Sequence, residues 1–199
     1  MEHLTLGIIY GSARHGRLCD SVVAWVCDQL AKTAPSLDRE ILDPASGEVE
    51  EAIYGNYRPS LEALLAKIDR CDAFIVVTPE YNHSYPAPLK ALIDCVGLEF
   101  AGKPVGFVSY GGLSGGLRAV EHLRNVFAEM HAMSVRTSLA FANANNSFAV
   151  DGQPGEALRA ARTLEAMLAE LVWWATPLKA ARAGNCYREM KQRFKGLAA

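Results

Sequence analysis

Five short apolar runs, separated by segments with helical periodicity, limit the possible folds of this 199-residue chain. The runs cover residues 4–10, 37–42, 73–78, 104–109 and 135–141. Nearly continuous apolar runs of this length are typical of strands that are buried on both faces of a sheet. The run 37–42 carries more charge than the others, which predicts a position nearer the sheet edge.

Apolar residues recur at helical spacing between these runs. The expected helices cover residues 20–32, 61–68, 88–96, the region around 120–130, and a long last helix that includes 164–175. Residues 44–59 are rich in turn formers and acidic residues, so we expect a long surface connection there. Strands that alternate with helices predict an α/β fold, with a parallel sheet covered on both sides. We find no repeat or linker and expect a single domain over residues 1–199.

The amino-acid composition excludes several classes of protein. Half of the residues are hydrophobic, which suffices for a substantial core, and a net charge of −2 with scattered basic residues argues against nucleic-acid binding. The first residues lack a signal-peptide pattern, so we expect no export or membrane insertion. Five cysteines without a Cys-x-x-Cys pair predict reduced thiols in a cytoplasmic protein. Cys19 has two interpretations, a buried thiol or a reactive one.

The loops after the first, third and fourth strands should converge at the carboxyl edge of the sheet, where ligands bind in such folds. The first loop, residues 11–17, combines two glycines, Ser12, Arg14 and Arg17 directly before a helix. Unpaired amides at a helix start attract anions, and arginine forks match phosphate. This loop therefore predicts a phosphate site, the alternative being an ordinary strand-to-helix turn.

The other two loops suit a flat aromatic ligand. Residues 78–86 place polar and aromatic side chains between prolines, which can provide a firm wall and backbone amides. Residues 109–116 contain four glycines, which leave space beside the backbone. The alternatives are a core-capping loop and a flexible turn, respectively.

In these motifs the chain resembles the NADPH-dependent FMN reductase family, within the flavodoxin-like fold. The matching segments are residues 11–14 with Gly16 and Arg17, residues 79–84, and residues 111–120, and the resemblance covers residues 4–135. It implies a three-layer sandwich with a five-stranded parallel sheet in the order 2-1-3-4-5. Many family members carry serine and asparagine where this chain has Arg17 and Cys19.

The resemblance also implies three groups of contacts to FMN. The phosphate would be held by Ser12, Arg14 and Arg17, with amides near Leu18 and Cys19. The isoalloxazine would be lined by Pro79, Glu80, Tyr81 and Asn82, and its other edge by Ser109, Gly111, Gly112, Gly115 and Gly116. Glu80 and His83 have two interpretations. Either they take part in acid–base chemistry, or Glu80 braces the loop or a partner chain and His83 is solvated.

We therefore predict an FMN-dependent enzyme that takes hydride from NADPH or NADH onto flavin N5. The acceptor would be a small molecule such as a quinone, azo or nitro compound, metal oxyanion or free flavin. The flavin carries the chemistry, so we expect no catalytic side chain and no metal. The alternatives are a reductase that releases reduced FMN to a partner oxygenase, and a non-catalytic flavin-binding or electron-carrier module. The resemblance further implies a homodimer or dimer of dimers. Trp173 and Trp174 are adjacent on the last helix and do not both face the sheet, so one would suit a subunit interface, the alternative being that both pack sideways on neighbouring helices.

Overall fold

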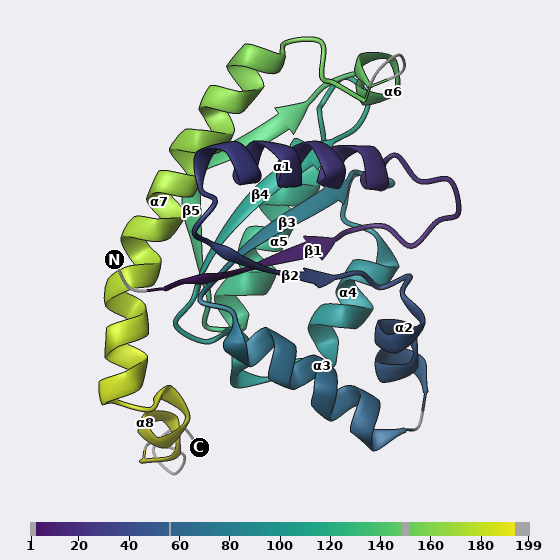
Figure 1. Ribbon diagram of the computed structural model, residues 1–199. Coiled ribbons are helices and arrows are strands. Elements are labelled where there is room, and N and C mark those ends of the chain that lie inside the picture. Colours follow the sequence, from purple (N-terminus) through teal and green to yellow (C-terminus); the bar gives the residue numbers. More distant parts are fainter. Residues whose placement is uncertain (1–2, 56, 149–151, 194–199) are drawn as a thin grey trace.

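All five expected strands form one parallel sheet, in the order β2-β1-β3-β4-β5 (Figure 1). The structure, a computed structural model, describes residues 3–55, 57–148 and 152–193. The strands are β1 (Thr5–Tyr10), β2 (Asp38–Leu42), β3 (Ala73–Pro79), β4 (Pro104–Tyr110) and β5 (Met133–Phe141). The predicted fold class and strand order are confirmed, and the more polar β2 lies at an edge of the sheet.

Helices cover both faces of the sheet (Figure 1). Because side chains alternate along a strand, Ile8 packs toward α1 (Cys19–Thr33) and α7 (Ala157–Gly184). Its neighbour Ile9 packs in the opposite cluster. That cluster is covered by α2 (Gly47–Tyr54), α3 (Arg58–Arg70), α4 (Ala87–Asp94) and α5 (Leu117–Glu129). Short helices complete the described chain at η1 (Leu98–Phe100), α6 (Ala144–Ser147) and α8 (Tyr187–Arg193).

The segment 44–59 corrects one expectation. We expected a surface connection without regular structure, but α2 occupies Gly47–Tyr54, so that prediction is wrong. The Ser46 hydroxyl caps the helix by accepting from the Val49 amide at 3.3 Å. Val49 and Ala52 are then buried in the core beside α3. Cap and packing outweigh the turn-forming composition of the segment.

At the amino-terminal edge of the sheet, one buried carboxylate ties α7 to the strands. Asp72, directly before β3, accepts from Lys179 Nζ and Arg182 Nη2, each at 2.9 Å. It also accepts from the Thr5 amide of β1 at 3.1 Å. We call these four residues the Asp72 clamp. It anchors α7 beyond Pro177, where proline removes a helical hydrogen bond.

Lys103 lies beside this clamp, directly before β4. Its ammonium is buried and donates to the carbonyl oxygens of Ile68 at 2.9 Å and Asp69 at 2.8 Å, in the last turn of α3. A cation at this position satisfies carbonyls that the helix leaves unpaired.

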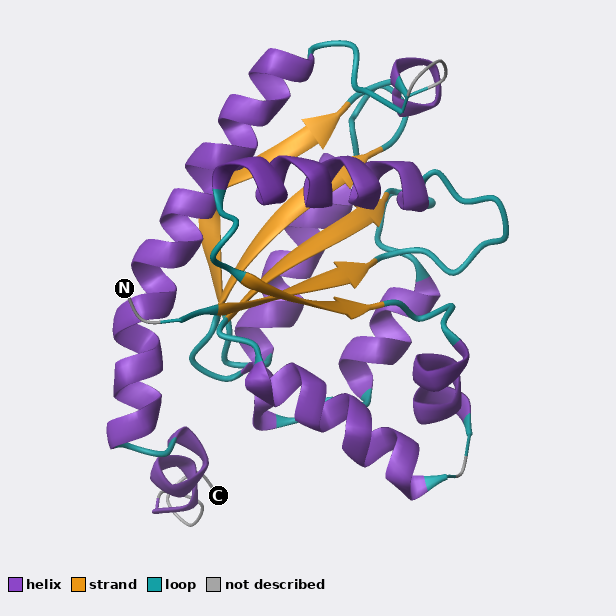
Figure 2. Ribbon diagram, in the orientation of Figure 1, coloured by secondary structure: helices purple, strands orange, loops and turns teal. Residues whose placement is uncertain are grey.

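The opposite, carboxyl edge of the sheet is where loops gather, because all strand arrows point the same way (Figure 2). Among the described residues, no helix is both long and apolar enough to cross a membrane.

Candidate functional site: a cleft at the carboxyl edge of the sheet

A cleft of about 510 Å³ opens at this edge, between the loops that follow β1, β3, β4 and β5. Its volume lies in the range of about 300–1,000 Å³ that small-molecule sites have. Of the predicted site residues, the cleft is lined by Arg14, Arg17, Leu18, Pro79, Glu80, Tyr81, Gly111 and Gly112. The loops after the first, third and fourth strands therefore converge.

The first loop is held close to the sheet by glycine. The Gly11 amide donates to the Val77 carbonyl oxygen at 2.7 Å. A Cβ on Gly11 would lie 2.7 Å from the Thr78 Cα, which is too close for any other residue. Gly16 has a φ of +65°, which also favours glycine. The loop leads into α1, and Leu18, the N-cap residue of this helix, lines the cleft.

Ser12 and Arg14 join this loop to the loop after β3. The Ser12 hydroxyl is buried and shares a hydrogen bond of 3.1 Å with the Tyr81 hydroxyl. The Arg14 guanidinium lies over the Tyr81 ring, with its Cζ 3.8 Å from the ring centroid. Arg14 is exposed, so this cation–π contact stands at the mouth of the cleft.

Arg17 has a different environment. Its Nη1 and Nη2 donate to the two carboxylate oxygens of Asp43 at 2.7 and 2.5 Å, and its Nε donates to Asp20 at 2.9 Å. Nη1 also donates to the Ser12 carbonyl oxygen, and the guanidinium lies 4.6 Å from the Tyr10 ring centroid. The hydrogen bonds with Asp43 raise the pKa of Arg17 above its already high ordinary value.

The loop after β3 forms a tight hairpin. Tyr81 and Ser84 exchange backbone hydrogen bonds of 2.9 and 3.0 Å. The two residues between them, Asn82 and His83, have φ of 51° and 66°, as the central residues of type I′ turns do. Both are exposed at the tip of the turn, and Asn82 does not line the cleft.

Glu80 braces this loop against the next one. Its carboxylate accepts from the Ser114 hydroxyl at 3.0 Å, from the Arg118 amide at 3.1 Å and from Arg118 Nη1 at 2.8 Å. Burial alone would raise the pKa of Glu80, but the hydrogen bonds from Arg118 and Ser114 outweigh it and hold the pKa below its ordinary value. The bracing interpretation of Glu80 therefore agrees with its contacts.

The glycine-rich loop shows two kinds of glycine. Gly111 and Gly112 line the cleft, and a Cβ on Gly112 would meet open space. Gly116 has a φ of +88°, and its Cβ would lie 2.7 Å from the Ser109 Cβ. The Ser109 hydroxyl donates to the Gly115 carbonyl oxygen at 2.8 Å. Ser109, Gly115 and Gly116 thus shape the loop from behind rather than line the cleft.

Cys19 likewise stands behind the cleft wall. Its thiol is fully buried and donates to the Val77 carbonyl oxygen at 3.5 Å. Burial raises the pKa of the Cys19 thiol, which favours the unreactive interpretation.

Sequence reasoning missed the wall that follows β5. Asn143, Ala144, Asn145 and Asn146 line the cleft together with Tyr110 at the end of β4. The Asn143 amide donates to the Gly112 carbonyl oxygen at 2.9 Å, and the Ala144 amide to that of Gly111 at 3.1 Å. The signal was present, because three asparagines follow directly on the last apolar run.

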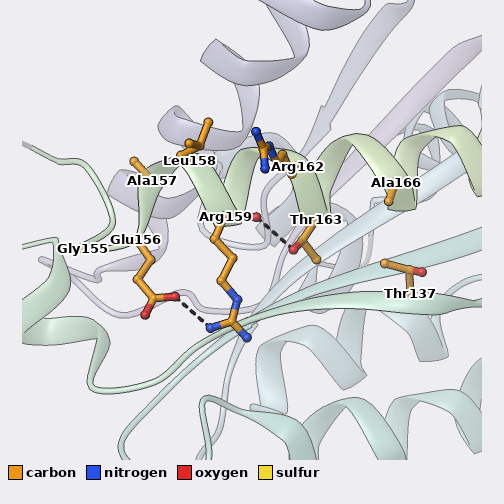
Figure 3. A pocket seen from close by; sticks show the side chains of 9 residues that line it. All are labelled: Thr137, Gly155, Glu156, Ala157, Leu158, Arg159, Arg162, Thr163 and Ala166. Carbon is orange, nitrogen blue, oxygen red and sulfur yellow. Dashed lines mark hydrogen bonds and ion pairs between the residues drawn. The ribbon is translucent and has the colours of Figure 1, made fainter.

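A second hollow, of about 720 Å³, lies along α7 beside β5 (Figure 3). Glu156 and Arg159 form an ion pair of 2.9 Å there. None of the predicted site residues lines this hollow. Over the described residues, no group of three or more His, Cys, Asp and Glu side chains is placed to hold a metal ion.

A parallel 2-1-3-4-5 sheet with a ligand cleft beyond β1, β3 and β4 defines a flavodoxin-like α/β protein. Within that class, the chain belongs to the NADPH-dependent FMN reductase family, whose model matches residues 4–146. The predicted family is confirmed.

Individual relatives agree with this assignment. An NAD(P)H-dependent FMN reductase of Schizosaccharomyces pombe is 37% identical over 118 residues, which cover 55% of this chain and 58% of the relative. A quinone reductase of Escherichia coli K12 is 32% identical over 168 residues, or 79% of this chain and 86% of the relative. This chain thus spans little more than half of the fission-yeast relative.

Among solved structures, FerB of Paracoccus denitrificans, a flavoenzyme NAD(P)H:(acceptor) oxidoreductase, has a TM-score of 0.67. The match covers 87% of this chain and 98% of FerB, at 21% sequence identity. It confirms the fold.

Proposed function

We propose that this chain is an FMN-dependent NAD(P)H oxidoreductase that passes electrons to a small-molecule acceptor of the quinone type. One observation carries the proposal: the start of α1, the hairpin at Tyr81 and the backbone of Gly111 and Gly112 line the same cleft. The names of the relatives, FMN reductase and quinone reductase, support it.

The residues present suit the phosphate of FMN. Arg14 is an exposed cation at the cleft mouth, and the first turn of α1 adds unpaired amides near Leu18 and Cys19. Together they supply charge and directed donors for a dianion. Ser12 does not line the cleft, and its buried hydroxyl, which shares a hydrogen bond with the Tyr81 hydroxyl, would support the phosphate end from behind.

The rest of the cleft suits a flat ring. Pro79, Glu80 and Tyr81 would form one wall, with Asn82 at the tip of the hairpin. Gly111 and Gly112 leave the opposite backbone bare, and a Cβ on Gly111 would lie only 3.2 Å from the Gly116 amide nitrogen. The absence of a Cβ at Gly111 lets the loop fold back on itself, and Gly112, with open space around it, leaves its peptide plane accessible to a ring.

Bound FMN would supply the redox chemistry, as acceptor of a hydride from NAD(P)H and donor of electrons to the acceptor. The chain would bind and orient it. The Glu80 carboxylate, engaged by Arg118 and Ser114, keeps the hairpin in register with the glycine loop and needs no proton-transfer role. No side chain is assigned as nucleophile.

The test is an anaerobic visible spectrum of the FMN-loaded protein before and after addition of NADPH or NADH. We expect the yellow flavin band to bleach on two-electron reduction, and a subsequent quinone to restore it. A band that persists with both nucleotides would refute the reductase and leave a carrier or binding module.

A second candidate is a reductase that releases reduced FMN to a partner oxygenase, and the name of the fission-yeast relative, an FMN reductase, supports its first half, the reduction of FMN. The two differ in how FMN behaves in steady-state assays. A tightly held cofactor saturates at enzyme concentration, whereas a consumed substrate shows a KM for FMN well above it.

We also propose a homodimer in the cytoplasm. Trp173 and Trp174 of α7 are 67% and 39% exposed, and their rings stand 4.7 Å apart, which suits an interface core. All five cysteines are free thiols, as in reducing compartments. Sedimentation velocity at micromolar concentration should show a dimer, and Trp173→Ser should shift it toward monomer. A monomeric wild-type protein would contradict the interface.

A further inference from the structure

Arg17 connects four separate segments of the chain. It lies over Tyr10 at the end of β1, donates to the Ser12 carbonyl oxygen in the phosphate loop, pairs with Asp20 in the first turn of α1, and pairs with Asp43 after β2. Four of its five N–H groups are thereby used. The Arg17 side chain thus ties the phosphate loop to α1 and to the segment after β2.

The charge of Arg17 is also largely neutralised. Two carboxylates face its guanidinium, and the Asp43 pair is well shielded from water, with side-chain exposures of 9% for Arg17 and 18% for Asp43. A phosphate that took Arg17 from Asp43 would leave that carboxylate partly buried without its cation. Such an exchange is unfavourable.

Asp43 is itself fixed. It follows β2, which is paired in register with β1, and its Oδ1 accepts from the Ala45 amide at 2.9 Å in addition to Arg17. The two hydrogen bonds from the Arg17 guanidinium to Asp43 therefore fix the position of the phosphate loop relative to the neighbouring strand β2.

We propose that Arg17 is a positioning residue, which acts through Asp43 to hold the Ser12–Arg17 loop in the shape that receives the FMN phosphate. This rests on the proposed FMN site. The division of labour is then definite: Arg14 and the α1 amides contact the phosphate, and Arg17 holds the loop that presents them.

The test compares FMN with riboflavin, which has the same ring system and lacks the phosphate. Equilibrium dissociation constants for both, from quenching of flavin fluorescence, are measured for the wild type and for Asp43→Asn. We expect Asp43→Asn to weaken FMN binding about tenfold or more and to leave riboflavin binding within about twofold. A direct Arg17–phosphate contact predicts the reverse, because freeing Arg17 and removing a negative charge would strengthen FMN binding.

Variants of Arg17 complete a double-mutant cycle. Arg17→Ala should weaken FMN binding by a similar factor, and Arg17→Ala with Asp43→Asn should be no weaker than the worse single variant, because both break one contact. Arg17→Lys keeps the charge and loses the fork, so it should behave like Arg17→Ala. Lysine that fully restores FMN affinity would contradict a role for the fork.

Asp28→Asn is the matched control, since it removes an exposed Asp from an ion pair with Lys32 on the outer part of α1. It should change neither dissociation constant. Equal weakening of FMN and riboflavin by Asp43→Asn would mean general damage to the fold and overturn the proposal, as would unchanged or tighter FMN binding. If the wild type binds neither flavin, or binds both equally, it is the proposed FMN site that fails.

Discussion

Arg14 and Arg17 stand three positions apart in one loop, yet their guanidinium groups meet opposite environments. Arg17 is enclosed by carboxylates, whereas Arg14 lies on the face of Tyr81. Within the described part of the chain, no carboxylate pairs with Arg14. A cation that has no competing carboxylate is the better partner for an incoming phosphate.

Replacement of Arg14 should therefore affect the phosphate end directly. A charge-assisted hydrogen bond contributes about 1.5–3 kcal/mol, so Arg14→Ala should weaken FMN binding about ten- to a hundredfold. Riboflavin affinity should stay nearly the same. Isothermal titration with both flavins checks this, and an FMN affinity equal to that of the wild type would remove Arg14 from the phosphate site.

Gly116 allows a second test at single-residue scale. Its φ of +88° and the 2.7 Å approach of a Cβ to Ser109 make alanine strained there. Gly116→Ala should lower the free energy of unfolding by about 1–3 kcal/mol. Gly112→Ala, in the same loop with open space around its Cβ, is the control and should cost much less. Urea denaturation measures both, and equal effects would show that the strain is absent.

At the scale of elements, the Asp72 clamp determines how firmly the end of α7 is attached. Asp72→Asn keeps the shape of the side chain and an acceptor for the Thr5 amide but removes both ion pairs. Breaking a largely buried pair is costly, and we expect a loss of about 2 kcal/mol in unfolding free energy.

Hydrogen exchange locates that effect. Amides of α7 after Pro177 should exchange faster in Asp72→Asn, while those of α5 on the other face keep their protection. Asp94→Asn, which breaks an exposed pair with Lys90, serves as the control. Uniform acceleration in both helices would argue for global destabilisation instead of local release.

The elements that carry a strong local pattern could be predicted from the sequence, and α2 could not. The strands were visible because Ile8, Ile75 and their neighbours form unbroken apolar runs. For α2, only Val49 and Ala52 of the eight helical residues are buried, so the helix depends on the Ser46 cap and on packing in a core shared with α3 and the more distant α4. Local composition contains neither piece of information.

At the scale of the whole molecule, Lys103 links stability to pH. Burial, with a smaller contribution from Arg182, lowers the pKa of Lys103 to about 8. Between pH 8 and the ordinary lysine pKa of about 10.4, the unfolded chain therefore binds more protons than the folded one, and the free energy of unfolding should rise with pH.

The rise is best measured as the difference in free energy of unfolding between the wild type and Lys103→Met, because the titrations of all other groups cancel in that difference. The wild type should gain up to about 3 kcal/mol relative to the variant from pH 8 to 10.5. The hydrogen bond that Lys90 donates to Asp94 raises the pKa of Lys90, so the difference for Lys90→Met should not rise over this window. A flat Lys103 difference in urea melts would contradict the buried ammonium.

The candidate site could be predicted from the sequence to the extent that it lies in loops after strands. The convergence of the loops with Arg14, Tyr81 and Gly111 follows from topology and motif together. The pairing of Arg17 with Asp43 could not be predicted, because the two residues are 26 positions apart in sequence and meet only when β1 and β2 pair. The Asn143–Asn146 wall needed only the same rule applied to the fifth strand.

The carboxyl edge of the sheet therefore carries the cleft, and the amino-terminal edge carries the stabilising contacts of the Asp72 clamp and Lys103. Selection for folding would remove substitutions in the Asp72 clamp, whereas substitutions in the cleft loops at the other edge leave the clamp intact. For the proposed reductase, we expect new acceptors to come from changes in loop residues that line the cleft, such as Asn145 and Asn146. Directed evolution of acceptor range should accordingly begin there and leave residues 72 and 103 untouched.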